Sequence, residues 1–160
     1  MFTNKRYAQA QVAFQRAGKI REAAICHAFL LREIARVVPD DHAKERVDAF
    51  VEAGEAFSTR ANESLPHQRR ERLVYYANAA ACFVQGRRFK EAGDCFVHAE
   101  KYSKAARTYR QGGCFDDMVK VLEEYGHQIG ADLLAELTKV AQVNYFKVGK
   151  SIHPERRNDY

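Results

Sequence analysis

The chain has 160 residues, of which 46% are hydrophobic and 29% are charged, and its formal net charge is +5. This composition is ordinary for a folded helical domain and excludes a disordered chain. No apolar stretch is long enough to span a bilayer, and polar residues follow Lys5 and Arg6 at the N-terminus, so we expect an intracellular protein, cytoplasmic or nuclear, with no secretory signal and no membrane contact.

Apolar residues recur every three or four positions through most of the chain, which predicts a series of amphipathic helices. The breaks between them fall at proline, glycine and clustered polar residues. The expected helices cover residues 4–17, 20–38, a span between Asp41 and Asn62, a span between Pro66 and Gly86, and residues 89–99, 102–111, 115–125 and 131–148. The chain is therefore expected to contain about eight helices and no sheet.

Residues suited to helix ends stand at several of these breaks. Gly18 is placed to cap the C-terminus of the first helix, and Asp40 or Asp41 to cap the N-terminus of the third. Asp116 and Asp117 stand where a later helix begins, so they complement the positive end of its dipole. These paired carboxylates have a structural explanation and do not indicate acid–base catalysis.

Residues 82–119 repeat with a period of thirteen residues. Cys82, Cys95 and Thr108 open the three units, and each is followed by an aromatic residue, by a second aromatic six residues later and then by a pair of small or apolar residues. The same block occurs upstream over residues 13–24, at an offset of 69 residues. Thirteen residues suit one short helix and its turn, and a fixed period marks stacked repeats.

The repeated pattern predicts an all-α, right-handed solenoid of antiparallel helices with irregular repeat lengths over residues 1–148. Residues 149–160 show no periodicity and are expected to form a loosely ordered polar tail. The thirteen-residue block resembles the helical hairpins of the tetratricopeptide (TPR) and SNAP-like superfamily, although its pair of units spans 26 residues rather than about 34. The expected fold is therefore TPR-like.

Two stretches carry a narrower resemblance. They are the run YANAAACFVQGRRFKEAGDCFVHAEKYSKAARTYRQGG over residues 76–113 and the run AICHAFLLREIAR over residues 24–36. Both resemble the helical-repeat region of large fungal proteins that carry a UvrD-type helicase domain, and that of the animal tetratricopeptide and ankyrin repeat containing protein. In that family a separate motor domain performs the ATP-driven chemistry, and this sequence has no GxxxxGK[ST] phosphate loop. The resemblance implies a fragment or a free-standing relative without the motor.

The side chains of Cys82, Cys95, His98 and Cys114 are donor types that zinc prefers, but the close ligand pairs of structural zinc sites are absent. The repeat offers another explanation, since alanine and threonine fill the position of the first two cysteines in other units, so cysteine there serves as a small hydrophobe. The four cysteines include no CxxC pair and are expected to be free thiols of a reducing compartment. We expect neither a metal nor a cofactor.

His27 falls in the apolar stripe of the second expected helix, together with Ile20 and Ile34. Its neighbour Cys26 suggests a nucleophile–base pair, but adjacent helix positions point about 100° apart. A buried, hydrogen-bonded structural histidine is the favoured interpretation. Since no other set of nucleophile, base and oxyanion donors stands at a usable spacing, we expect the protein not to be an enzyme.

Charge is banded along the chain, because residues 66–110 carry 10 basic and 4 acidic residues whereas residues 39–65 carry 3 and 7. A secondary basic patch, Arg69, Arg70 and Arg72, lies in the first turns of the fourth expected helix, where cations are electrostatically disfavoured. One explanation is an anionic partner, and the other is packing against the acidic side chains of the third expected helix. Those side chains are Glu52, Glu55 and Glu63.

A basic ridge is predicted from the first short turn and the hairpin after it. It comprises Arg87, Arg88, Lys90, Lys104, Arg107 and Arg110. Lys104, Arg107 and Arg110 are spaced by three residues, so they lie along one face of a helix. The ridge is either a partner-binding surface or a solvated face. Aromatic residues alternate with these cations, a pattern that can indicate base stacking, although their fixed repeat positions favour a core role. The rings are Phe83, Phe89, Phe96, Tyr102, Tyr109 and Phe115.

The favoured function is a non-catalytic scaffold that presents a groove to a peptide or helix of a partner protein. If the basic ridge binds this partner, the partner segment is expected to be acidic. The resemblance would make the chain an accessory domain related to UvrD-type helicase proteins. The alternative is a nucleic-acid-binding accessory module that uses the basic ridge. The basic band and the helicase resemblance favour the alternative, whereas the acidic bands and the lack of a nucleic-acid-binding motif count against it.

Overall fold

The computed structural model describes residues 2–147, so the tail predicted over residues 149–160 lies outside the described part. Within residues 2–147 the chain forms eight α-helices and one 3-10 turn, with no strand. The elements are α1 (Phe2–Arg16), α2 (Ile20–Val37), α3 (Ala43–Asn62), α4 (Arg69–Gln85), α5 (Phe89–His98), α6 (Tyr102–Gln111), α7 (Phe115–Tyr125), η1 (Gly126–Gln128) and α8 (Ala131–Lys147). The predicted all-helical class is confirmed, and the predicted boundaries are confirmed to within about two residues.

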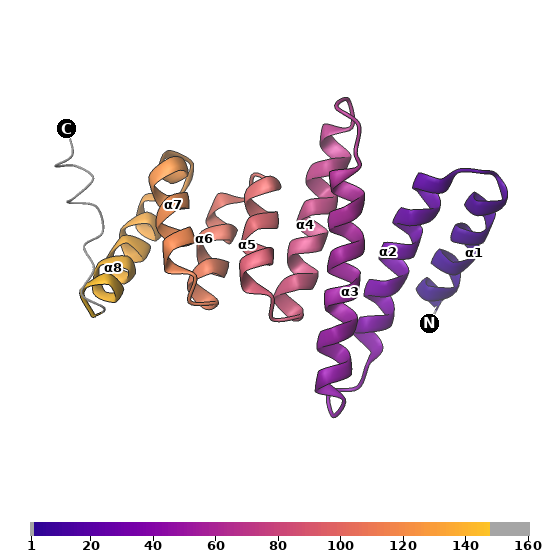
Figure 1. Ribbon diagram of the computed structural model, residues 1–160, viewed down its shortest axis with the longest axis horizontal. Coiled ribbons are helices and arrows are strands. Elements are labelled where there is room, and N and C mark those ends of the chain that lie inside the picture. The colour runs from indigo at the N-terminus through magenta and orange to yellow at the C-terminus, as the bar shows by residue number, and fades with distance from the viewer. Residues whose placement is uncertain (1, 148–160) are drawn as a thin grey trace.

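The helices lie in a row in chain order, with α1 at one end and α8 at the other (Figure 1). Each helix packs against the one that follows it, most extensively α3 against α4 and α2 against α3. The three helices α2–α4 are long and the three helices α5–α7 are short. No helix in the part of the chain that the structure describes is long and apolar enough to cross a membrane.

Side-chain contacts also join helices that are two apart in the chain. These contacts are Arg32–Asn78 (α2–α4), Ser58–Cys95 (α3–α5), Lys90–Asp117 (α5–α7) and Arg110–Glu136 (α6–α8). Each contact links an even-numbered helix to an even one or an odd-numbered helix to an odd one. These contacts place α2, α4, α6 and α8 in one layer and α3, α5 and α7 in the other, while α1 packs against α2 at the end of the row.

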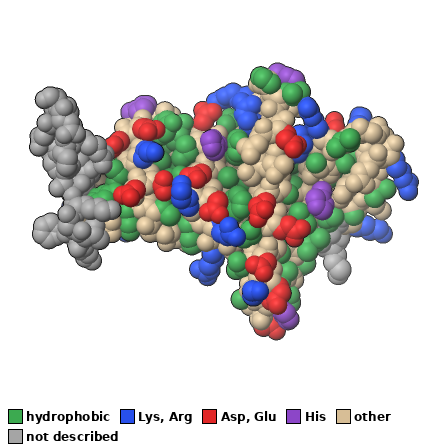
Figure 2. Space-filling model, viewed as in Figure 1, with side chains coloured by type: hydrophobic (Ala, Val, Ile, Leu, Met, Phe, Trp, Pro, Cys, Tyr) green, Lys and Arg blue, Asp and Glu red, His purple; other side chains and the backbone are tan. Residues whose placement is uncertain are grey.

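The two layers differ in charge. Helices α2, α4 and α6 carry nine Lys and Arg residues against three Glu residues. Helices α3, α5 and α7 carry five Lys and Arg residues against ten Asp and Glu residues. Figure 2 shows the acidic side chains along the middle of one face, over α3, α5 and α7. The bands of charge along the sequence thus become two layers of unlike charge in the fold.

Small residues of the repeat let neighbouring helices approach closely. Ala92 and Ala105, one period apart, are fully buried. A Cβ added to Gly93 would lie 2.3 Å from the Tyr109 ring, so no larger residue fits at this contact between α5 and α6 without displacing the ring. The small residues of the repeat therefore lie where neighbouring helices approach most closely.

The ends of four helices repeat one backbone geometry. Gly18, Arg87, Glu100 and Gly113 have φ of +72°, +59°, +60° and +73°. In each case the next residue donates its N–H to the carbonyl oxygen five positions back, at 2.8–2.9 Å, which is the pattern of a Schellman C-cap. The four positions keep the spacings of 13 and 69 residues found in the sequence. Two of them hold residues with a Cβ, for which this conformation is strained.

The N-terminal cap predicted for α3 is wrong. The helix begins after His42 rather than after Asp40 or Asp41, and no side chain there accepts a hydrogen bond from its first turn. Asp41 instead lies 3.0 Å from Nδ1 of His42. The carboxylates of Asp116 and Asp117 do stand in the first turn of α7, as expected from the helix dipole.

The apolar stripe predicted for α2 is also wrong in part. Ile20 and Ile34 are 78% and 42% exposed, and His27 is exposed rather than buried. The buried positions of α2 are alanines, Ala28 and Ala35 among them. A helix inside a row is covered by the helix before it and by the helix after it. Its buried positions therefore form two narrow strips, which a search for a single wide stripe does not separate.

The strained cap at Arg87 gives the first prediction. We expect the Arg87→Gly variant to be more stable than Arg87→Ala by about 0.5–1 kcal/mol, because only glycine adopts a positive φ without strain. Both variants lose the same charged side chain, so their difference isolates the backbone. Urea unfolding of the two proteins measures it, and equal stabilities would contradict the assigned cap geometry.

Candidate functional site

One face of α4 is left uncovered by the packing. Its residues Arg70, Val74, Ala81 and Gln85 are spaced by about one or two helical turns and are all exposed, with Val74 at 49%. Ala79, Ala80 and Phe83 on the opposite face are buried in the core. Two hollows flank the open face of α4, and both include Asn78. This surface is the candidate functional site.

The first hollow, which we call the basic-rimmed hollow, has a volume of about 480 Å³. Its floor is apolar and consists of Leu73, Val74 and Ala77 of α4 together with Ala99, which follows α5. Its rim is basic and consists of Arg69, Arg70 and Lys101. An apolar floor with charged groups at its edge suits a ligand that has both apolar and anionic parts.

The second hollow, which we call the arginine hollow, lies between α2, α3 and α4 and has a volume of about 310 Å³. Its lining is more polar than that of the first hollow. The lining residues are Arg32, Arg36, Arg46, Phe50, Asn78, Ala81, Cys82 and Gln85. Three guanidinium groups from two helices therefore face one small space.

The guanidinium of Arg32 is held in place from several sides. It donates a hydrogen bond of 2.7 Å to Oδ1 of Asn78 in α4 and one of 3.3 Å to Glu33. It also lies 4.9 Å from the ring centroid of Phe29 and 5.8 Å from that of Phe57. Planar guanidinium groups stack on aromatic faces in this way, so the orientation of Arg32 is fixed by apolar and polar contacts together.

Arg46 and Arg36 complete the arginine hollow. Arg46 of α3 donates hydrogen bonds to the carbonyl oxygens of Arg36 and Val38, at 3.2 and 2.9 Å, and so satisfies carbonyl groups at the C-terminal end of α2. Its guanidinium lies 5.3 Å from the Phe50 ring centroid. Arg36 donates a hydrogen bond of 2.7 Å to the carboxylate of Glu33, which it shares with Arg32.

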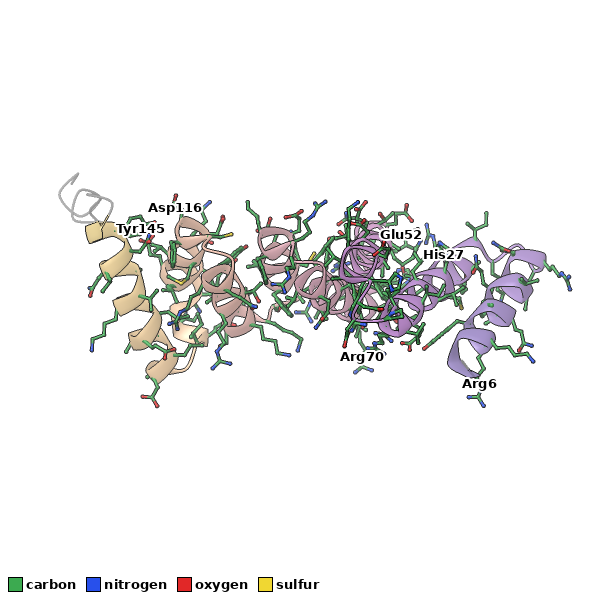
Figure 3. All side chains as sticks on the ribbon, turned by 90° about the horizontal axis from the view of Figure 1, so that it is seen from below. Arg6, His27, Glu52, Arg70, Asp116 and Tyr145 are labelled. Atoms are coloured by element: carbon green, nitrogen blue, oxygen red, sulfur yellow. The ribbon has the colours of Figure 1, made fainter. Side chains whose placement is uncertain are left out.

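The secondary basic patch lies beside the basic-rimmed hollow. Arg69 forms an ion pair with Glu100 in the turn between α5 and α6, and Nη1 of Arg72 lies 3.4 Å from the carbonyl oxygen of Leu65. Figure 3 shows Arg70 pointing away from the side on which Glu52 lies.

The prediction that Glu52, Glu55 or Glu63 compensates this patch is therefore wrong. The carboxylate of Glu63, the residue after α3, pairs with Arg60 in the last turn of that helix, at 2.7 Å. The two helices present their charged faces to opposite sides of the molecule, because α3 and α4 belong to different layers.

The residues of the predicted basic ridge spread over one turn and two helices. Arg87 and Arg88 lie in the turn before α5, Lys90 lies in the first turn of α5, and the other three lie along α6. Three of the six cations pair with carboxylates: Arg88 with Glu91, Lys90 with Asp94 and Asp117, and Arg110 with Glu136. The use of the ridge as a binding surface stays a prediction.

The thiols of Cys82 and Cys95 are buried in the core, as expected for small hydrophobic residues. Burial raises the pKa of Cys82 to about 11, although Arg32 and Arg36 oppose the shift. Burial, with the nearby carboxylate of Asp94, raises the pKa of Cys95 to about 11 as well. Within residues 2–147 no three His, Cys, Asp or Glu side chains are grouped closely enough to hold a metal ion.

The aromatic residues of the repeat serve the core, as predicted. Phe83, Phe96 and Tyr109 are buried, and Phe89, Tyr102 and Phe115 are half-buried. The Tyr102 ring stacks on Tyr125, with centroids 3.9 Å apart. Rings already covered by neighbouring helices are not available as a platform for bases.

The arginine hollow was not predicted from the sequence. One local signal was present, because Arg32 and Arg36 are four residues apart and so share a face of one helix. Asn78 and Arg46 gave no signal, since nothing in their local sequence indicates that they lie near α2. Comparisons with protein-family models, curated proteins and solved structures find no match to this chain.

The buried thiols give a second prediction. A pKa of about 11 leaves Cys82 with on the order of 100-fold less thiolate at pH 8.5 than an unperturbed thiol. We expect iodoacetamide to alkylate the half-buried Cys114 well before Cys82 or Cys95 in the native protein, as read by peptide mass spectrometry. In urea the differences should disappear. Equal native rates would show that the core around α4 and α5 is not closed.

Proposed function

We propose that this protein is a non-catalytic interaction scaffold, a TPR-like right-handed solenoid of antiparallel helices that binds a segment of a partner protein on α4. The basic-rimmed hollow carries the proposal. Its apolar floor of Leu73, Val74 and Ala77 lies open beside two basic residues, Arg70 and Lys101, that form no ion pair within residues 2–147. Helical-repeat proteins commonly bind extended or helical segments on such surfaces.

The composition of this surface indicates which kind of partner segment binds it. An apolar floor favours apolar side chains of the partner, and the basic rim favours acidic residues beside them. A phosphate backbone would use the rim but would leave the floor uncovered. The proposed partner segment is therefore short and carries both apolar and acidic side chains.

A non-catalytic role is supported by the structural use of the reactive side chains. The thiols of Cys82 and Cys95 are buried, with their pKa values raised, and the His27 side chain is exposed on the surface of α2. The relation to UvrD-type helicase proteins, in which this chain would be an accessory domain without the motor, rests on the sequence resemblance alone.

The scaffold proposal predicts that a charge on the floor of the basic-rimmed hollow abolishes partner binding. We expect Val74→Glu to lower capture of partner proteins from nuclease-treated native extract at least 10-fold, because it places a carboxylate where apolar side chains dock. Ile20→Glu is the matched control, since Ile20 is an exposed apolar residue 78% accessible at the start of α2. Both variants should keep the melting temperature of the wild type. Undiminished capture by Val74→Glu would contradict the proposal.

A nucleic-acid-binding accessory module is the second candidate, favoured by the basic layer of α2, α4 and α6. The pairing of Arg88, Lys90 and Arg110 with carboxylates reduces the positive charge that the basic ridge offers to phosphate. Exposed pairs of this kind contribute only about 0–1 kcal/mol each, so a strong polyanion could displace them. The salt dependence of binding separates the two candidates, because only a phosphate backbone releases many condensed counterions.

The ridge gives a fourth prediction. If nucleic acid is the ligand, replacing Arg87, Arg88, Arg107 and Arg110 with Ala should abolish binding of a single-stranded 20-nucleotide probe without lowering the melting temperature. Wild-type affinity should fall steeply with salt, as measured by fluorescence anisotropy. If the quadruple variant still binds the probe, the ridge is a solvated face. If the wild-type protein does not bind the probe, nucleic-acid binding is contradicted and the scaffold function is the candidate that remains.

A further inference from the structure

We propose that the arginine hollow is an oxyanion site, which receives a carboxylate or phosphate group carried by the partner segment on α4. The proposal rests on the scaffold function only for the source of the oxyanion. The site itself is defined by Arg32, Arg36, Arg46 and Asn78. Apart from Asn78, which lines both hollows, no residue of the basic-rimmed hollow is needed for it.

The guanidinium groups in the hollow keep donors to spare. Each carries five N–H bonds in a planar fork. Within residues 2–147, Arg32 uses Nε and Nη1, Arg36 uses Nη1, and Arg46 uses Nη1, while the remaining nitrogens make no hydrogen bond to protein. Spare donors of adjacent forks can grip one oxyanion through several charge-assisted hydrogen bonds.

The charges in the hollow are out of balance. Three cations face it, and Glu33 is the carboxylate that pairs with two of them. Phe50 and Cys82 line the same space and are almost completely buried, so the hollow is only partly solvated. Partial exclusion of water strengthens both the repulsion among the arginines and the attraction of each to an added anion. A second negative group would relieve the imbalance.

The hollow is also preorganised. Arg32 is fixed by Asn78 and by the Phe29 ring, and Arg46 is fixed by backbone carbonyls and by the Phe50 ring. An anion therefore binds without first ordering these long side chains, which removes much of the entropic cost of binding. Lysine could not replace the arginines, because an ammonium group has neither the fork geometry nor the stacking surface.

The position of the hollow matches the proposed docking surface. Asn78 belongs to both hollows, with its side chain between them on α4. A segment whose apolar side chains cover Val74 and Ala77 can therefore place its next acidic or phosphorylated side chain among Arg32, Arg36 and Arg46. Recognition at two adjacent points would also fix the direction of the bound segment.

The test uses two small anions as probes, inorganic phosphate and glutarate, each titrated at constant ionic strength in chloride. Backbone amide shifts of residues near the hollow, in α2, α3 and α4, report binding by NMR. We expect saturable shifts in the wild type and at least 10-fold weaker binding by Arg36→Glu. Arg36 is half-exposed and its side chain bonds to Glu33 alone, so this variant should fold.

Arg21→Glu is the matched control. It makes the same change in charge on the same helix, about 22 Å away along α2, and should alter the affinity less than 2-fold. Tighter binding of phosphate would indicate a phosphorylated segment, and tighter binding of glutarate an acidic one. The absence of saturable binding, or an equal loss in Arg21→Glu and Arg36→Glu, would overturn the site. Anion binding without partner capture would contradict the scaffold proposal alone. Partner capture without anion binding would contradict the oxyanion site alone.

Discussion

The close approach of each helix to its chain neighbours is the constraint on which this structure depends. A row of helices has no central core, so every helix must bury its apolar surface against the helices beside it. Small residues set the distance between neighbouring helices. Gly93 lies under the Tyr109 ring, and Gly54 of α3 lies under Phe83 of α4, where an added Cβ would meet the ring at 2.9 Å. Where one member of such a pair is small, the other can be a large aromatic.

The same constraint decides which surfaces remain open. A helix that buries two narrow strips against its neighbours leaves its outward face exposed to solvent or to a ligand. On α4 this face carries Arg70, Val74 and Asn78 instead of the uniformly charged residues of a merely solvated helix. The hollow on one side of α4 is completed by residues of α2 and α3, and the hollow on the other side by Ala99 and Lys101 of the turn after α5. The proposed binding surface is thus a consequence of the stacking.

Layering also converts the charge bands of the sequence into a property of the fold. Consecutive helices alternate between layers, so acidic α3, α5 and α7 come together on one side, and basic α2, α4 and α6 on the other. Ion pairs such as Lys90–Asp117 and Arg110–Glu136 follow the layers and not the chain order. A partner with acidic side chains would be drawn toward the basic layer and repelled by the acidic one, which gives the molecule a preferred binding side.

The sequence by itself determined the helices, their boundaries and their turns, because these follow from local periodicity and turn chemistry. The repeat, with its spacings of 13 and 69 residues, also matches the left-handed caps at Gly18, Arg87, Glu100 and Gly113, two of which lack the glycine that usually marks them. The sequence repeat also explains the burial of Cys82, since its position in the repeat is filled by small side chains. Local rules failed for the N-terminus of α3, where no side chain caps the helix, and for the stripe of α2, which two neighbours cover.

Only the tertiary structure decided which distant residues meet. Arg32 and Asn78 are 46 residues apart, and Arg69 and Glu100 are 31 apart, so neither pair has a signature in local sequence. His27 has an apolar context along the chain but lies on the surface, because the helices on either side of α2 cover other strips of it. The arginine hollow likewise needs the side-by-side placement of α2 and α4 with α3 behind them. Contacts between layers depend on where whole helices come to lie, and periodicity within a single helix carries no information about that.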